Sequence, residues 1–193
     1  MGTFREICKQ VKSIGHKYGF LFKHEEEVRG YKGEIFIKGY EEGKLVLNLY
    51  TPNVIVNTAS ILIARLLKDS SEPIGGITFL SLGTGGAGWD LQDPPAPTTN
   101  QTQLEAELYR KRYTGTAFIN PLDGTESSEP TNIVDYSFNF LESEAVGPIV
   151  ELGLFGGDAT DGINTGTLVN YRTFPVINKT NSMAFTIIIR ITT

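Results

Sequence analysis

The sequence predicts a mainly β protein, an antiparallel β-sandwich or a flattened barrel, and three observations lead to this fold class. The first is the strict alternation of residues 183–192, which places every second side chain on one apolar face of a strand. That face consists of Met183, Phe185, Ile187, Ile189 and Ile191. The second observation is a similar alternation within residues 131–140, and the third is a series of strand-like runs without regular helical crossovers. Together they favour antiparallel architecture.

The size and charge of the chain narrow the classes of function. Its 193 residues suffice for one self-supporting domain. The net charge of −5 and the pI near 5.1 argue against nucleic acid as the main ligand, because phosphate binding needs a basic face. The single cysteine, Cys8, excludes an internal disulfide and a cysteine-based zinc site. No run approaches the roughly 18 apolar residues of a membrane span, so we expect no membrane partner.

The N-terminal part predicts a helical arm and hinge over residues 1–30, ahead of a β domain over residues 31–193. Thr3 and Glu6 form a capping-box pattern, and apolar residues recur at helical spacing until Gly19. The apolar stripe consists of Phe4, Ile7, Val11, Ile14 and Tyr18. It can dock on its own β domain, bind a partner or lie on a membrane surface. We expect a partner interface formed by this stripe and Trp89.

The β domain opens with a predicted hairpin. Residues 34–38 and 44–50 are strand-like and are joined by the turn sequence GYEEG. The strand extends past Pro52, whose missing N–H predicts a sheet edge or a bend. Asn57 or Thr58 then caps a short amphipathic helix over about residues 59–68.

The later elements are strands separated by turn-rich loops. A strand over 77–82 leads into a long loop rich in Gly and Pro. Residues 103–112 are helical by propensity, although their second half suits a strand equally well. The fold class therefore includes one or two short inserted helices. Strands are expected over 131–140 and in the runs IVELGLF, TLVNYRTF and AFTIIIRIT.

The glycine loop, residues 83–88, satisfies the pattern G-x-G-x-x-G after a strand. A dinucleotide site also needs a helix that begins at the last glycine and holds the pyrophosphate. The residues that follow Gly88, WDLQDPPAP, cannot form one. We therefore expect no cofactor, and a loop that lets Trp89 fold back over the sheet or meet a neighbouring subunit.

Residues 158–164 place Asp158, Asp161 and Asn164 three residues apart. The segment lacks the D-x-D-x-D-G spacing and the late glutamate of a calcium loop. We predict a polar hairpin tip and no metal site, and a bound cation remains the alternative.

The chain offers few groups for catalysis. His16 and His24 are its only histidines, and no serine stands in a G-x-S-x-G setting. The pair Glu142 and Glu144, like Asp135 and Asn139, occupies positions expected to face solvent rather than a substrate. The sequence predicts no catalytic residues and no enzyme.

Four spaced motifs, together with the order of the strands, resemble a domain widespread in virion proteins of tailed bacteriophages. The motifs are the GTG loop at Gly83–Gly85, an E-x-x-R segment from Glu107 to Arg110, the E-x-G-L-F strand from Glu151 to Phe155, and the turn from Phe174 to Lys179. The resemblance covers about residues 44–193. The family that the chain resembles includes the virion-proximal domain of tail fibres and small tail or head accessory proteins.

The resemblance implies a structural subunit that assembles symmetrically in the tail, baseplate, neck or fibre-adaptor region. Its partners would be other virion proteins and copies of itself, and its location the virion, after synthesis in the host cytoplasm. Fibre members continue into a shaft and a receptor-binding tip, whereas this sequence ends at Thr193, which favours a short subunit. The alternatives are a capsid decoration protein and a host-surface carbohydrate-binding module that uses Trp89, Tyr109, Tyr113 and the loop 158–164.

Overall fold

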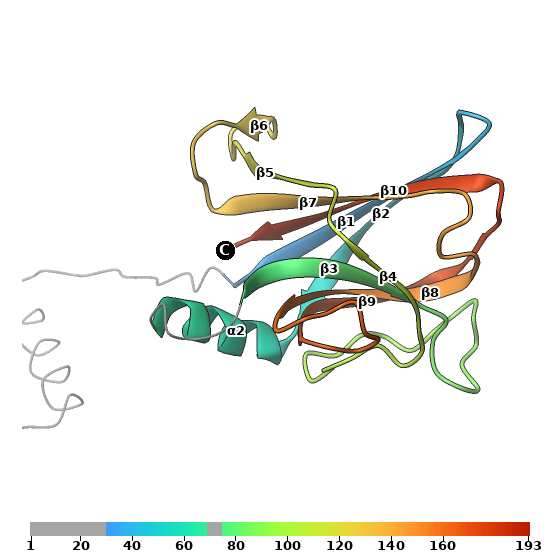
Figure 1. The fold of residues 1–193 in the computed structure, drawn as a ribbon, viewed down its shortest axis with the longest axis horizontal. Coiled ribbons are helices and arrows are strands. Elements are labelled where there is room, and N and C mark those ends of the chain that lie inside the picture. Colours follow the sequence, from blue (N-terminus) through green and yellow to red (C-terminus); the bar gives the residue numbers. More distant parts are fainter. Residues whose placement is uncertain (1–29, 69–74) are drawn as a thin grey trace, which may run out of the picture. The chain divides into compact units, whose positions relative to one another are not determined.

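Ten strands form one antiparallel sheet in the computed structural model, which describes residues 30–68 and 75–193 (Figure 1). The predicted arm helix and its stripe of Phe4, Ile7, Val11, Ile14 and Tyr18 lie outside the described residues. Residues 31–193 make up one compact unit, the body, and the observations below concern this unit alone.

The strands are β1 (Lys32–Glu41), β2 (Lys44–Ile55), β3 (Gly75–Gly83), β4 (Glu107–Arg112), β5 (Gly115–Ile119), β6 (Glu126–Ser127), β7 (Ile133–Phe140), β8 (Gly147–Gly157), β9 (Thr167–Lys179) and β10 (Met183–Thr192). Their order in the sheet is β4-β3-β8-β9-β2-β1-β10-β7-β5-β6. Within the described ranges the single helix is α2 (Asn57–Lys68), which follows β2. The mainly β, antiparallel fold class is confirmed.

Strand β2 connects the two halves of the sheet. It pairs with β1 from Lys44 to Asn53, and then with β9 through only two residue pairs, Val54 with Tyr171 and Ile55 with Asn170. Pro52, where an edge or a bend was predicted, lies two residues before this change of partner. One continuous sheet results. It is not closed into a barrel, and the described residues show no sandwich of two separate sheets.

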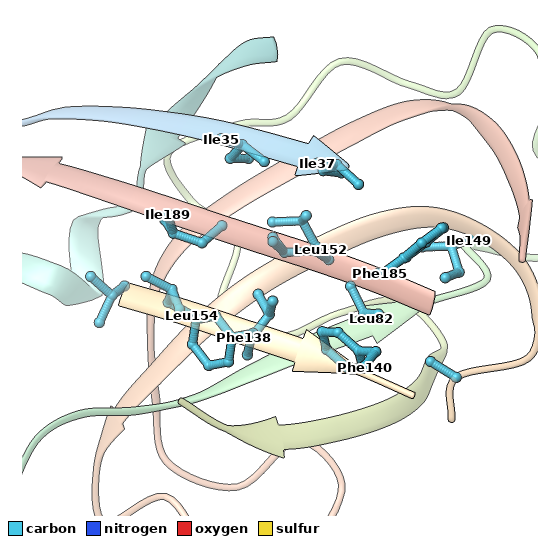
Figure 2. Close-up of a cluster of buried hydrophobic side chains, with 14 of the residues drawn as sticks. Ile35, Ile37, Leu82, Phe138, Phe140, Ile149, Leu152, Leu154, Phe185 and Ile189 are labelled. Atoms are coloured by element: carbon cyan, nitrogen blue, oxygen red, sulfur yellow. The ribbon is translucent and has the colours of Figure 1, made fainter. Parts of the chain in front are cut away.

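One buried cluster takes side chains from both halves of the sheet (Figure 2). Ile35, Phe138 and Ile187 come from β1, β7 and β10, and Leu82 and Leu152 come from β3 and β8. The sheet therefore curves around a shared core. In Figure 1 the strands β7, β10 and β1 accordingly run above β3, β8 and β9. Burial of such side chains contributes roughly 1.5–3 kcal/mol each.

The period-two patterns predict the buried faces correctly. In β10 the buried residues are Phe185, Ile187, Ile189 and Ile191, and in β7 they are Phe138 and Phe140. The predicted hairpin is confirmed as β1 and β2, joined by Glu42 and Gly43 at φ values of 48° and 75°. Two consecutive positive φ values suit the right-handed twist of hairpin strands.

The helical alternative for residues 103–112 is wrong. Residues 107–112 form β4, which pairs with the edge of β3 from Phe79 to Gly83. Helix propensity amounts to a few tenths of a kcal/mol per residue, which ladder hydrogen bonds and buried contacts outweigh. The inserted helix predicted over about 59–68 is confirmed as α2, with Ala59 and Leu62 buried.

Adjacent isoleucines on β10 test the face assignment. Ile187 is fully buried, whereas Ile188 lies on the opposite, half-exposed face. We expect Ile187→Ala to lower the free energy of unfolding by about 2–5 kcal/mol, because it leaves a cavity. Ile188→Ala, the matched control, should cost less than about 1 kcal/mol. Urea unfolding in dilute solution measures both, and equal losses would contradict the assignment.

Candidate functional site

Two of the four resemblance motifs, the GTG loop and the E-x-G-L-F strand, meet at a buried polar network around Glu151 of β8. This carboxylate is fully buried and accepts three backbone N–H groups, from Gly85 at 3.2 Å, Glu105 at 3.1 Å and Ala106 at 2.9 Å. Gly85 and Ala106 lie near the two ends of the loop 84–106 that joins β3 to β4. A buried carboxylate needs such partners, because desolvation without them costs several kcal/mol. Glu151 thus fixes both ends of this loop.

The hydroxyl of Tyr171 on β9 is the fourth donor to Glu151, at 2.5 Å. Burial raises the pKa of Tyr171 far above its ordinary value, and the hydrogen bond and negative charge of Glu151 raise this pKa further. The phenol therefore stays protonated and keeps its donor role at every physiological pH. With four donors, the acceptor positions of Glu151 are used within the body.

The motif around Glu151 also packs the loop 84–106 onto the sheet. A Cβ at Gly153 would stand 2.6 Å from Leu168 Cδ1 and 3.1 Å from Leu104 Cδ1, so only glycine admits these contacts. Leu154 enters the main core, whereas Phe155 joins a second buried cluster with Leu104. Each member of the E-x-G-L-F pattern thus has a packing role.

Glu107 and Arg110 of β4 form a second buried pair, although three residues apart they would normally face opposite sides of a strand. The ladder shifts here: Leu82 pairs with Tyr109 and Gly83 with Glu107, so one residue, Leu108, is bulged. The bulge turns Glu107 onto the face of Arg110. Their bonds are bidentate, with Nε–Oε1 at 2.7 Å and Nη2–Oε2 at 3.0 Å, and both side chains are nearly inaccessible to solvent.

This pair holds the loop 158–166 between β8 and β9. Arg110 Nη1 donates to the carbonyl oxygens of Thr160 and Thr165 at 3.0 and 2.9 Å, and the Asn164 N–H donates to Glu107 Oε2 at 2.7 Å. The guanidinium also stacks on the Phe155 ring, 4.3 Å from its centroid. A charge-assisted bidentate pair of this kind fixes geometry as well as adding stability.

The segment 158–164, predicted as a polar hairpin tip with a bound cation as the alternative, is held by these contacts. Asn164 Oδ1 accepts the Leu104 N–H at 3.2 Å, so its oxygen has a protein partner. Asp158 and Asp161 are both exposed. Within residues 30–68 and 75–193, no three His, Cys, Asp or Glu side chains gather into a group that could hold a metal.

Trp89 lies against its own loop and is half-buried. A Cβ at Gly85 would stand 2.7 Å from Trp89 Cε3, and one at Gly86 would stand 2.6 Å from its Nε1. The glycines therefore let the indole fold back, which is one of the two predicted roles of the loop. No helix begins at Gly88, since the described residues 89–106 are turns and irregular backbone.

The other predicted site residues are brought into ion pairs and core contacts. The Glu144 carboxylate accepts hydrogen bonds from Lys111 Nζ at 2.5 Å and from the Tyr109 hydroxyl at 3.0 Å. Asp135 pairs bidentately with Arg190, at 2.7 and 2.9 Å. Glu144 and Asp135, two of the carboxylates considered for glycoside hydrolysis, and the Tyr109 hydroxyl considered for glycan binding thus have partners within the body. Tyr113 lies near the Tyr136 ring, with centroids 6.3 Å apart.

Two features were missed at the level of sequence. Lys179 is buried, and its Nζ donates to the carbonyl oxygens of Leu141 at 3.0 Å and Glu142 at 2.9 Å. Burial lowers the pKa of Lys179, although the charges of Glu142 and Glu144 oppose the shift. An apolar cavity of about 210 Å³ lies between α2 and the sheet, lined in part by Leu62, Leu66, Ile77, Val134 and Ile191. The resemblance motif from Phe174 to Lys179 includes this lysine but does not indicate that it is buried, and no sequence pattern indicates the cavity.

Comparisons with known proteins add no relative. The chain matches no protein-family model and no curated protein sequence. No helix in the described parts of the chain is long and apolar enough to span a membrane.

Arg110→Lys tests whether the buried pair holds the loop 158–166. Lysine keeps the charge but loses the bidentate geometry, so we expect a loss of about 1–3 kcal/mol and faster proteolysis within 158–166. Arg112→Lys on the same strand is the control: Arg112 stacks on the Phe79 ring, 4.6 Å from its centroid, without a bidentate carboxylate, so the expected loss stays within about 1 kcal/mol. Unchanged stability and proteolysis in Arg110→Lys would contradict the role.

Glu144 gives the body a predictable dependence on pH. Burial acts to raise its pKa, but hydrogen bonds from Lys111, the Leu141 N–H and Tyr109 outweigh it and leave the pKa below its ordinary value of 4.5. The unfolded chain therefore binds more protons just below pH 4.5, and stability falls as pH drops through that window. The melting temperature of the wild type should fall between pH 5 and pH 3, and we expect this fall to be smaller in Glu144→Gln. An unchanged slope would contradict this assignment.

Proposed function

We propose that this chain is a non-enzymatic structural subunit of a tailed-phage virion, acting in the tail, baseplate, neck or fibre-adaptor region. Its curved sheet would serve as the two layers of a sandwich, and it would work by symmetric assembly with copies of itself and with other virion proteins. The proposal rests on the spaced motifs of residues 44–193 and on what their side chains do in the body.

The observation that carries the proposal is the use of the motif residues as fixed points for loops. Glu151 holds the ends of the loop 84–106, and Glu107 with Arg110 holds the loop 158–166. Their charged atoms are directed at backbone and at each other. A scaffold whose loops must keep one shape in every copy requires such buried, fully bonded charges, because they fix geometry.

The arm of residues 1–30 is the proposed link to neighbouring virion proteins. An isolated helix of this length is marginal in water, so its apolar stripe needs a surface to bury against. We assign that surface to another protein of the particle. The basic residues of the arm, Arg5, Lys9, Lys12 and Lys17, would favour an acidic partner.

Deletion of residues 1–22 tests this role. The body should keep its melting temperature, because residues 31–193 form a compact unit with their own buried cluster. Incorporation into particles should be lost, as measured by mass spectrometry of virions purified from cells that carry the deleted gene. The control replaces the exposed Asp161 by Asn and should be incorporated normally.

Three outcomes would contradict the proposal or the role it gives to the arm. If full-length protein is absent from purified particles, the chain is not a virion subunit. If the deletion lowers the melting temperature by several degrees, the arm belongs to the core of its own body. If the protein that lacks residues 1–22 is incorporated normally, the arm is not needed for assembly.

A further inference from the structure

The outer face of β2, β1, β10 and β7 carries three parallel rows of side chains. The pairing register places Tyr50, Phe36, Ile188 and Ser137 side by side in a central row, one residue from each strand. The Phe36 and Tyr50 rings are 5.1 Å apart, and Tyr50 is 58% exposed. An aromatic and aliphatic row on an open sheet face is typical of the centre of an interface.

One flanking row is acidic. Glu34, Arg190 and Asp135 are neighbours across β1, β10 and β7. Arg190 is bonded to Asp135, and its pKa is raised first by that hydrogen bond and further by the charges of Asp135 and Glu34. Glu34 itself accepts the Tyr50 hydroxyl at 2.7 Å. With two carboxylates and one guanidinium, this row carries one net negative charge.

The other flanking row is basic. Lys38 lies beside Asn48 and Thr186, and Thr186 lies beside Asn139. Lys38 is exposed and has no ion pair or hydrogen bond within residues 30–68 and 75–193. Thr186 and Asn139 bond each other at 3.0 Å, so Lys38 supplies the one net charge of this row.

This arrangement is self-complementary. A rotation by 180° about the central row exchanges the two flanking rows. A second copy stacked on the face would then bring its basic row onto the acidic row of the first. The rest of the chain is acidic and repels its copies, whereas the two flanking rows carry two acids and two bases, Glu34, Asp135, Lys38 and Arg190. The exposed Lys32 follows on the same face, beyond the acidic row.

We propose that two copies of this chain pair through the outer face of β2, β1, β10 and β7, with Lys38 of each subunit against Glu34 of the partner subunit. The central rows stack on one another, as inner faces do where two sheets pack about 10 Å apart. This inference rests on the proposed function, for which it names the surface that joins copies.

The size of the face sets the strength of the pairing. Four strands about 4.8 Å apart and seven residues of about 3.4 Å each give a flat area of roughly 450 Å². Stable complexes bury about 800 Å² on each partner. The dimer should therefore form and dissociate with protein concentration, and be strengthened in a particle by other contacts.

Charge reversals at positions 34 and 38 test the pairing. Glu34→Lys and Lys38→Glu each create two like-charge contacts per dimer, so each alone should raise the dimer Kd about tenfold or more. An equimolar mixture of the two variants should recover dimerisation. In the mixed dimer both contacts join opposite charges: the new Glu meets the new Lys, and the native Lys38 meets the native Glu34. Sedimentation equilibrium over a range of concentrations measures all three.

The matched control is Glu129→Lys, which makes the same charge change on an exposed residue outside the face and should dimerise like the wild type. Melting temperatures confirm that each variant is folded. A wild-type chain that stays monomeric at every concentration, single variants that dimerise normally, or a mixture that fails to recover would each overturn the pairing. The virion proposal is tested separately, because it depends on incorporation into particles and not on the molar mass measured by sedimentation equilibrium.

Discussion

The change of partner along β2 is the constraint on which the rest of the body depends. Ten residues of β2, from Lys44 to Asn53, lie beside β1, and only the next two residues pair with β9. That short junction keeps the ten strands in one sheet while letting the halves curve around a single core (Figure 1). The curvature buries one face of β1, β10 and β7 and leaves their other face to solvent. It thus creates both the interior and the open face to which we assign pairing.

Buried charges then decide which loops keep a fixed shape. Glu151 lies within a strand that is buried on both sides, and its cost of burial is offset by four donors. The pair of Glu107 and Arg110 does the same for a second loop, with the Phe155 ring beneath the guanidinium. Loss of one member would leave an uncompensated charge, so these positions are sensitive to substitution. Charges used in this way support a scaffold role.

The sequence predicts local structure well where one face is buried. The period-two runs of β7 and β10, the hairpin of β1 and β2 and the apolar stripe of α2 all follow from spacing and turn residues. The long-range pairing of Val54 with Tyr171 does not, since no local pattern specifies which strand lies beside β2. A sandwich of two sheets was therefore expected where one sheet is present.

The buried network was only partly visible in the sequence. The lone glutamate in the apolar run IVELGLF could have indicated a paired buried charge, but no such prediction was made. Nothing local reveals the bulge at Leu108 that joins Glu107 to Arg110. Helix propensity was misleading for the same segment, because tertiary partners of Tyr109, Arg110 and Lys111 outweigh it.

The central claim is that the open face of β1 and β10 is covered when copies assemble. Hydroxyl-radical footprinting of the wild-type chain at low and high concentration tests it most directly, with Tyr50 as the reporter and Tyr113 as the internal reference. Both rings are accessible in the single chain, at 58% and 42% exposure. The account predicts that oxidation of Tyr50 falls as concentration rises while that of Tyr113 stays constant. Oxidation of Tyr50 that does not change with concentration, or an equal fall at both rings, would contradict it.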